Sequence, residues 1–242
     1  LKPIVGTNEP LLQVNNLVTR YPVKGGVLRR TLARVHAVED VSFTIMKGKT
    51  LSLVGESGCG KSTVGRSLIR LVEPTSGDVN LDGQNILSLN PKDMREARSN
   101  IQMVFQDPFA SLNPQMMLID QVAEPLRNYG TVKREVLQEK IGDLFDRVKL
   151  PRSFMQRYPH QLSGGQRQRI AIARALALNP KLIIADEAVS ALDVSVQAQV
   201  LNLMMELQVD LGLSFLFISH DMAVVERVSH DVGVMYLGRL VE

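Results

Sequence analysis

One eight-residue run, Gly55 to Ser62, constrains the fold of this chain more than any other feature. It reads GESGCGKS and fits the pattern G-x-x-x-x-G-K-[ST] at every fixed position. Residues 50–54 before it, TLSLV, are typical of a short buried strand. Residues 63–71 after it predict a helix with apolar Val64, Leu68 and Leu71. A strand, a glycine-rich loop and a helix in this order predict a phosphate-binding loop, the P-loop.

The residue types of this loop suit a polyphosphate. Glycines allow the positive φ angles that point successive N–H groups inward, and the helix N-terminus adds its positive dipole end. Lys61 is expected to reach the β- and γ-phosphates, and Ser62 to ligate Mg²⁺. A glycine-rich turn that matches by chance is the alternative, and the flanking pattern disfavours it. The expected phosphate-binding residues are Gly55, Glu56, Ser57, Gly58, Cys59, Gly60, Lys61, Ser62 and Thr63.

The composition is that of an ordinary globular protein, with 45% hydrophobic and 22% charged residues among 242. The sequence shows no signal peptide and no apolar run near the roughly 18 residues that a membrane helix needs. One cysteine excludes an internal disulfide, and a net charge of +3 is too weak to argue for nucleic acid. Because the chain does not begin with Met, we expect a fragment or a domain of a longer protein.

Strand and helix patterns alternate along most of the chain. A basic insertion at 24–30 is expected to form an exposed hairpin or loop, and the charge-rich segment 118–157 is a candidate helical subdomain with apolar positions 136, 141, 144, 145 and 148. This alternation predicts an α/β fold with a largely parallel sheet covered on both faces. The expected strands are 11–18, 41–45, 50–54, 78–83, 101–105, 181–186, 213–219 and 232–236, and the other expected helices begin after Ser163, near 196 and near 222.

Two acids follow the apolar run at 182–185. Asp186 at the strand tip could hold the Mg²⁺ shell, and Glu187 could polarise a water for attack on the γ-phosphate. The alternative is an acidic, solvated strand end. The P-loop in the same chain favours the hydrolytic interpretation.

A second candidate anion site lies at 162–166, LSGGQ, where Ser163 is a plausible helix N-cap. A serine-capped helix start is a sufficient explanation of this pattern by itself. A hydroxyl, small residues and a helix dipole nevertheless also suit a phosphate. Two such sites in one chain suggest a head-to-tail pair in which each P-loop faces the partner's serine loop. The residues concerned are Ser163, Gly164, Gly165 and Gln166.

The P-loop, Gln106, the run 162–166, the acidic pair, the run 190–193 (SALD) and His220 occur in the order of the nucleotide-binding domain of ABC transporters, which the sequence resembles over nearly its whole length. The resemblance implies one ATP-binding domain over 1–242. Its fold would be a P-loop NTPase core with a mostly parallel sheet, an N-terminal antiparallel β subdomain and an inserted helical subdomain at about 107–178.

The resemblance also implies roles for single residues. Glu187, His220 and Gln106 would be catalytic, with His220 holding the γ-phosphate and the attacking water. Mg²⁺ would be held by Ser62, Gln106 and Asp186. Tyr21 would stack on adenine, and Asp193 would lie against the opposite active site. From the residues alone, Tyr21 could simply pack in the core, and a lone His220 could be structural.

Finer likeness narrows the group. Residues 106–114, QDPFASLNP, resemble bacterial oligopeptide, dipeptide and nickel importer ATPases, and 186–195 with 16–22 are most similar to those that serve glutathione import. Where most ABC proteins have Pro-Thr, this chain has Ala188 and Val189, which leaves the effect on turnover open.

The likeness implies an ATP-hydrolysing motor at the cytoplasmic face of the bacterial inner membrane. Its partners would be a second ATP-binding domain, transmembrane permease subunits and, indirectly, a periplasmic binding protein, with no nucleic acid expected. The alternatives are import of dipeptides, oligopeptides or nickel, and a non-transport ABC ATPase that acts on nucleic acid or translation.

Overall fold

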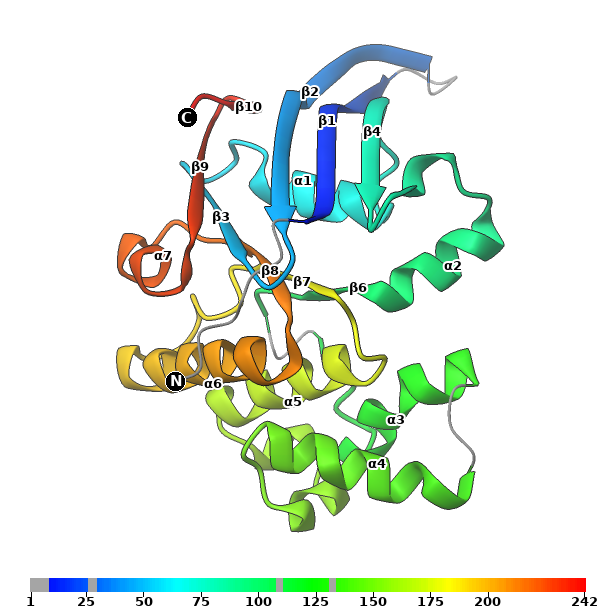
Figure 1. The fold of residues 1–242 in the computed structure, drawn as a ribbon, viewed down its shortest axis with the longest axis vertical. Helices are drawn as coiled ribbons and strands as arrows, with labels where there is room; N and C mark the ends of the chain where they lie inside the picture. Colours follow the sequence, from blue (N-terminus) through cyan, green and yellow to red (C-terminus); the bar gives the residue numbers. More distant parts are fainter. Residues whose placement is uncertain (1–8, 26–29, 108–110, 131–133) are drawn as a thin grey trace. The chain divides into compact units, whose positions relative to one another are not determined.

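The computed structural model describes residues 9–25, 30–107, 111–130 and 134–242 (Figure 1). The chain divides into two compact units, and each is best understood by itself. The first unit comprises Leu1–Arg98 with Ser214–Glu242, and the second comprises Ser99–Leu213. The P-loop lies in the first unit, and the acidic pair and the LSGGQ run lie in the second.

An antiparallel sheet forms one part of the first unit, in the order β2-β1-β4-β5. The long strands β1 and β2 pair from Pro10 opposite Met46 to Gly25 opposite Arg30. The expected strands at 11–18, 41–45 and 78–83 are confirmed, and the ends of the 24–30 insertion pair as a hairpin, although 26–29 lie outside the described residues. The bounds are β1 Pro10–Gly25, β2 Arg30–Met46, β4 Ser76–Leu81 and β5 Gln84–Asn85.

Parallel strands form the other part of the first unit. Strand β3 (Thr50–Val54) lies between β8 (Ser214–Ile218) and β9 (Asp231–Tyr236) and runs parallel to both. Every residue of β3 and β8 is buried, as expected of parallel strands that are covered on both faces. Helix α7 (Met222–Val228) precedes β9, and β10 (Arg239–Leu240) pairs antiparallel with β9.

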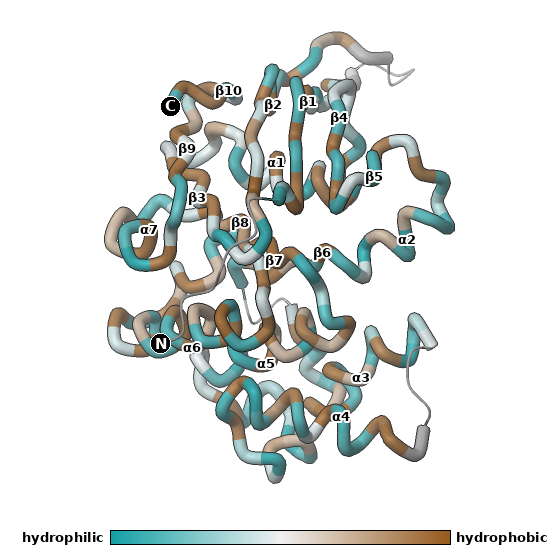
Figure 2. Tube along the Cα trace, in the orientation of Figure 1, coloured by the Kyte–Doolittle hydropathy of each residue, from teal (hydrophilic) through white to brown (hydrophobic). Residues whose placement is uncertain are grey.

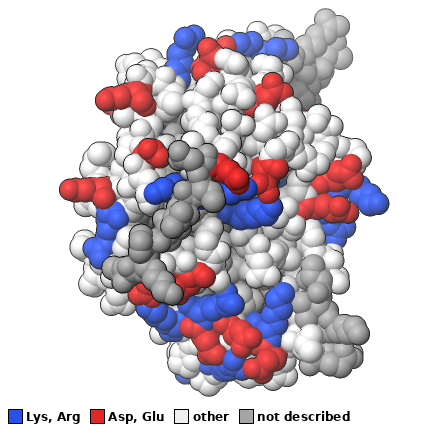
Figure 3. Space-filling view, viewed as in Figure 1, with Lys and Arg blue, Asp and Glu red and all other residues white. Residues whose placement is uncertain are grey.

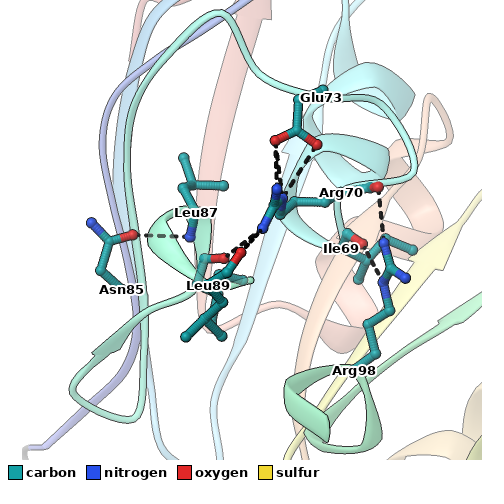
Figure 4. A network of polar contacts seen from close by, with 8 residues as sticks. Ile69, Arg70, Glu73, Asn85, Leu87, Leu89 and Arg98 are labelled. Atoms are coloured by element: carbon teal, nitrogen blue, oxygen red, sulfur yellow. Dashed lines mark hydrogen bonds and ion pairs between the residues drawn. The ribbon is translucent and has the colours of Figure 1, made fainter. Parts of the chain in front are cut away.

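The helix that follows the P-loop, α1 (Lys61–Leu68), is shorter than the sequence predicts. Arg70 adopts a left-handed conformation with φ 51, so the chain leaves the helix axis before Leu71, which is 56% exposed rather than on the apolar face. Arg98 donates to the carbonyls of Ile69 and Arg70 at 2.8 and 3.0 Å (Figure 4). These bonds satisfy carbonyls that the end of a helix leaves without an intrahelical partner.

A second arginine extends the same polar network. The Arg70 guanidinium donates to the Leu89 carbonyl at 2.7 Å and to the Glu73 carboxylate (Figure 4). Arg70 and Arg98 together therefore fasten the end of the P-loop helix to the segment after β5. That segment contains the 3₁₀ turn η1 (Ile86–Ser88) and helix α2 (Pro91–Asn100).

The second unit combines two parallel strands with helices. Strand β6 (Ile101–Val104) pairs with β7 (Leu182–Asp186), so both expected strands are confirmed. Helices α3, α4 and α5 contact one another, and α5 also contacts α6 and β6. Figure 2 shows polar and apolar residues alternating along these helices, as expected when one face of each is buried. The bounds are α3 Leu118–Tyr129, α4 Arg134–Arg147, η2 Arg152–Gln156, η3 Pro159–Gln161, α5 Gly164–Leu176 and α6 Val194–Leu211.

The core of the helical segment follows the expected pattern with one exception. Ile141, Leu144, Phe145 and Val148 are buried, but Val136 is 55% exposed. Val136 lies five positions before Ile141, so the helix turns Val136 well away from the buried stripe. Residues 108–110 of the run 106–114 lie outside the described residues.

None of the helices within the described residues has the length and apolarity needed to cross a membrane. On the face drawn in Figure 3, Lys and Arg lie among Asp and Glu. In the second unit, Arg152 pairs with Glu139, Asp143 and Asp146, and the hydrogen bonds to Glu139 and Asp146 raise the pKa of Arg152.

Candidate functional site

The P-loop has the conformation that its glycines predict. Gly55, Gly58 and Gly60 have φ angles of 146, 80 and 111, in the region that side chains avoid. A Cβ on Gly60 would lie 2.2 Å from the Ala37 carbonyl oxygen, and the Gly238 N–H donates to the Cys59 carbonyl at 2.9 Å. The loop is therefore packed against neighbouring backbone and needs glycine at position 60.

Lys61 lies inside this loop rather than on its surface. It is 4% exposed, and its Nζ donates to the Gly55 and Glu56 carbonyls at 2.7 and 2.8 Å. Its ammonium also lies 3.7 Å from the Sγ of buried Cys59. An ammonium ringed by backbone at a loop centre provides a point charge for a phosphate oxygen.

The N-terminus of α1 lies at the end of the same loop. Its N-cap, Gly60, makes no side-chain capping bond, and the first turn holds no acidic residue. No side chain at this N-cap therefore competes with an anion for the helix N–H groups.

Tyr21 and His220 belong to the same unit as the P-loop. The Tyr21 hydroxyl lies 3.4 Å from the Thr63 hydroxyl in the first turn of α1, and the ring is 36% exposed. His220 lies two residues beyond the end of β8 and is exposed. Because Leu53 of β3 pairs in parallel register with Ile218 of β8, the P-loop and His220 leave the same edge of these strands. That edge, at the carboxyl ends of parallel strands, is where α/β folds bind ligands.

The pair Arg20 and Glu39 fixes the strands next to Tyr21. The Arg20 guanidinium donates to both Glu39 oxygens, at 3.2 and 2.5 Å. These bonds hold the pKa of the Glu39 carboxyl below its usual value, and the imidazole of His36 contributes in the same direction.

Gln106, Asp186 and Glu187 share one strand edge in the second unit. Val104 of β6 pairs with Ala185 of β7, so Gln106 and Glu187 each lie two residues beyond a matched pair. Gln106 Nε2 donates to Glu187 Oε2 at 2.8 Å, and Asp186, the last residue of β7, is 3% exposed. The strand register thus brings the expected catalytic pair together.

The LSGGQ run begins a helix with a complete capping box. Ser163 Oγ accepts from the Gln166 N–H at 3.3 Å, and Gln166 Oε1 accepts from the Ser163 N–H at 3.0 Å. The expected N-cap is confirmed, and its polar atoms bond within the loop.

The two glycines of this run have a packing role that the sequence did not indicate. A Cβ on Gly165 would lie 2.3 Å from Val196 Cγ1 of α6, and one on Gly164 would lie 3.3 Å from Leu192 Cδ2. Both positions let α5 approach the turn at 187–192 and α6, whose N-cap is the exposed Asp193.

Two further features escaped the sequence analysis. Ser190 donates to the Glu187 carbonyl from both its N–H and its hydroxyl. A pocket of ≈ 370 Å³ also lies in the second unit. The sequence analysis did not predict a pocket here, although part of its lining belongs to the run 106–114; it is lined by Ser111, Leu112, Asn113, Pro114, Met116, Gln121, Glu124 and Arg174.

Within the described residues, no three His, Cys, Asp or Glu side chains gather into a metal cluster. Mg²⁺ at nucleotide sites is commonly held by one or two protein oxygens together with phosphates and water. The Ser62 hydroxyl in the first unit and the buried Asp186 carboxylate in the second are each an oxygen ligand of the kind that Mg²⁺ accepts, so each residue by itself suits the ion.

The model of the family described as ABC transporter matches residues 38–190. The chain therefore belongs to the ABC transporter family, and the resemblance inferred from the motifs is confirmed.

Closer relatives point to one group within the family. The chain is 57% identical over 97% of its length to the glutathione import ATP-binding protein GsiA of Pectobacterium atrosepticum and to that of Escherichia coli. It spans 38% of the length of these relatives.

Solved structures confirm the α/β fold as that of an ATP-binding cassette. The chain is similar to cbiO1 from Clostridium perfringens, part of the ABC transporter complex cbiONQ, with a TM-score of 0.82 and 26% identity over 97% of this chain and 88% of that one. It is also similar to the ATP-binding cassette MJ0796 in a dimeric post-hydrolysis state bound to ADP and Pi. That match has a TM-score of 0.82 and 29% identity over 96% of this chain and 97% of that one.

Proposed function

We propose that the chain is the ATP-hydrolysing motor domain of a bacterial ABC importer for glutathione or small peptides, peripheral to the cytoplasmic face of the inner membrane. The observation that carries this proposal is the 57% identity to glutathione import ATP-binding proteins over 97% of the chain. The intact P-loop and the contact between Gln106 and Glu187 support the enzymatic part.

The phosphate-binding groups are those of the first unit. Lys61 and the N–H groups at the start of α1 bind the phosphates, with the rest of the run 55–63 around them. Tyr21 stacks on the adenine, and the hydrogen bond of its hydroxyl to Thr63 supports this role. His220 contacts the γ-phosphate from the edge that it shares with the P-loop.

The proposed hydrolytic groups are those of the second unit. Glu187 accepts a proton from the attacking water, and Gln106 orients Glu187 and that water. Ser62, Gln106 and Asp186 hold Mg²⁺, which neutralises phosphate charge when bound.

A second ATP-binding domain completes this proposal. Ser163, Gly164, Gly165 and Gln166 of one domain would close over the nucleotide of the other, and Asp193 would approach the opposite site. The dimeric state of the ADP-bound MJ0796 cassette supports a pair of such domains, for which we propose the head-to-tail arrangement. Binding of ATP then favours the closed pair because the closed state has the higher affinity.

The pocket in the second unit supports a role in contacting a permease subunit. Its wall is rigid, since buried Gln121 bonds the Asn113 N–H, the Asn113 carbonyl and the Met116 carbonyl at 2.9, 3.1 and 2.9 Å. Its polar lining includes Arg174, which donates to Glu124 at 2.7 Å and to the Ser111 carbonyl at 3.0 Å. Such a pocket suits a polar segment of a membrane subunit.

The substitution Glu187→Gln tests the enzymatic proposal. We expect turnover of ATP to fall by about 10² to 10⁴, the size of a lost general base, while ATP affinity stays unchanged. Glu206→Gln on exposed α6 is the matched control and should hydrolyse ATP normally. Normal turnover by Glu187→Gln would show that Glu187 is not the base.

Reconstitution tests the transport proposal. The protein is assembled with permease subunits and a periplasmic binding protein of a glutathione importer, and ATP hydrolysis is measured with glutathione, dipeptides or nickel complexes. Stimulation by glutathione or by dipeptides supports the proposed cargo and distinguishes between the two, and stimulation by nickel complexes alone reassigns it. Co-purification with nucleic acid in place of membrane subunits would refute a transport role.

A further inference from the structure

The backbone at Glu187 is unusual for a residue with a side chain. Its φ angle is 48, in the left-handed region that residues other than glycine seldom adopt. This conformation bends the chain sharply after β7 and begins the turn at 187–192. Residues held in such regions need support from their surroundings, and they cluster at functional sites.

The support comes from Ser190, three residues later in the same turn. The Ser190 N–H donates to the Glu187 carbonyl at 3.1 Å, and the Ser190 hydroxyl donates to the same oxygen at 3.0 Å. A carbonyl oxygen has two lone pairs, so it can accept both bonds. The Leu192 N–H donates to the Val189 carbonyl at 3.1 Å and extends the turn by one further bond.

The other end of Glu187 is also held, because its carboxylate accepts the hydrogen bond from Gln106. The carboxylate can reach Gln106 only if the backbone turns correctly after Asp186. The main chain and the side chain of Glu187 are therefore fixed by different residues, and Ser190 is responsible for the main chain.

We propose that Ser190 is a positioning residue for the catalytic base Glu187, which it orients through the Glu187 carbonyl without touching the nucleotide. This proposal rests on the proposed function, in which Glu187 accepts the proton of the attacking water. A displacement of about 1 Å in a catalytic group can lower a rate by up to about 10²-fold. Ser190 is exposed to solvent, so we expect a smaller effect.

Substitution of Ser190 by alanine is the first test. Ser190→Ala should lower kcat for ATP by about fivefold to tenfold and leave KM within about twofold, because the lost contact orients the base and does not bind substrate. Ser190→Thr keeps the hydroxyl and should restore kcat to within about twofold of the unsubstituted protein.

Two controls separate positioning from general stability. Ser88 also donates through its hydroxyl to a carbonyl three residues earlier, that of Asn85 at 2.9 Å, in the other unit. Ser88→Ala removes an equivalent bond and should leave kcat unchanged. If Ser190→Ala fails to fold, Ser190→Val is compared with Ser190→Thr, since the two side chains have nearly the same shape and only Thr donates.

A double-mutant cycle decides whether Ser190 acts through Glu187. In a Glu187→Gln background, Ser190→Ala should lower the residual turnover by less than about twofold, because the group that it orients is no longer a base. An unchanged kcat in Ser190→Ala would overturn the positioning role. A further loss of about fivefold to tenfold in the double variant would overturn it too, even if Glu187→Gln alone lowers turnover as expected. Normal turnover by Glu187→Gln alone would instead refute the proposed function.

Discussion

The two helix starts that the sequence marks as anion sites, those of α1 and α5, differ in how their N-termini are satisfied. At α1 the N-cap is Gly60, which makes no side-chain capping bond. At α5 the N-cap Ser163 and Gln166 satisfy each other in a capping box. The first helix start is thus organised around its own lysine and an incoming anion. The second is stable by itself, and the Ser163 hydroxyl, which accepts the capping bond, can still donate its proton to a phosphate.

This difference is physically consistent with the proposed roles. A loop that binds ATP within one domain has to be prepared before the nucleotide arrives, so that few groups must be reordered on binding. A loop that acts on a partner's nucleotide must be stable while the partner is absent. Capping by Ser163 gives α5 that independence.

Alanine substitutions of the glycines in the two loops give the strongest test of this difference. Gly60→Ala should lower the free energy of unfolding by about 2 to 4 kcal/mol, because it combines a left-handed φ with backbone contact. Gly164→Ala should change it by less than about 1 kcal/mol, because the new Cβ meets only the end of a flexible leucine. Urea titration of both variants measures the difference. Equal losses would show that the two loops are equally constrained.

Lys61 provides the next largest effect. Removal of its ammonium in Lys61→Ala should weaken ATP affinity by about 10²-fold, the size of one or two charge-assisted hydrogen bonds. Lys92→Ala on exposed α2 is the control and should bind ATP normally. Isothermal titration calorimetry gives both affinities. If Lys61→Ala keeps full ATP affinity, the buried ammonium only stabilises the loop. The start of α1 would then differ from that of α5 in structure but not in ATP binding.

Elements with agreeing local signals were predictable from sequence alone. Strand β3 and the start of α7 fall where they were expected, because apolar runs and breakers agree there. The expectations for Leu71 and Val136 as apolar positions of helices were wrong for different reasons. Arg70 ends α1 in a left-handed conformation that no glycine or asparagine announced, and Val136 lies off the buried stripe of α4.

The candidate site likewise has features that the sequence predicts and features that it does not. The sequence indicates which residues are polar and where strands end, so Gln106 and Glu187 could be expected at one edge. It does not indicate that Glu187 is left-handed, because glutamate carries no preference for that region, so the double bond from Ser190 was not predictable. The sequence also does not show that position 165 must be glycine because Val196 packs against it.

Ser163 separates capping from phosphate contact. Ser163→Ala should lower the free energy of unfolding by about 1 kcal/mol through loss of the cap. Ser163→Asp should keep the cap and full stability but abolish the ATP-dependent pairing of domains, because a carboxylate repels the γ-phosphate. Urea titration and light scattering with ATP measure the two properties. Pairing of Ser163→Asp at normal strength would leave α5 with only its structural role.

The smallest effect concerns the strand that leads to the P-loop. The backbone N–H of Thr50 at the start of β3 donates to the ring nitrogen Nδ1 of His230 at 3.1 Å. The backbone N–H of His230 donates to the Thr50 carbonyl at 2.9 Å. Partial burial lowers the pKa of His230 below its usual 6.5, and the charge of Lys49 adds to this while Asp231 opposes it. Because the unfolded chain then binds more protons than the folded one, stability should fall as the pH drops below about 6.5.

The substitution His230→Asn isolates this term, since the amide oxygen can accept the Thr50 bond and cannot titrate. We expect the urea midpoint of this variant to fall less between pH 7.5 and about 5.5 than that of the unsubstituted protein. His160→Asn in the second unit leaves the Thr50 contact intact and should keep the full pH dependence. Identical pH profiles for His230→Asn and the unsubstituted protein would mean that protonation of His230 next to β3 does not change the stability of the protein.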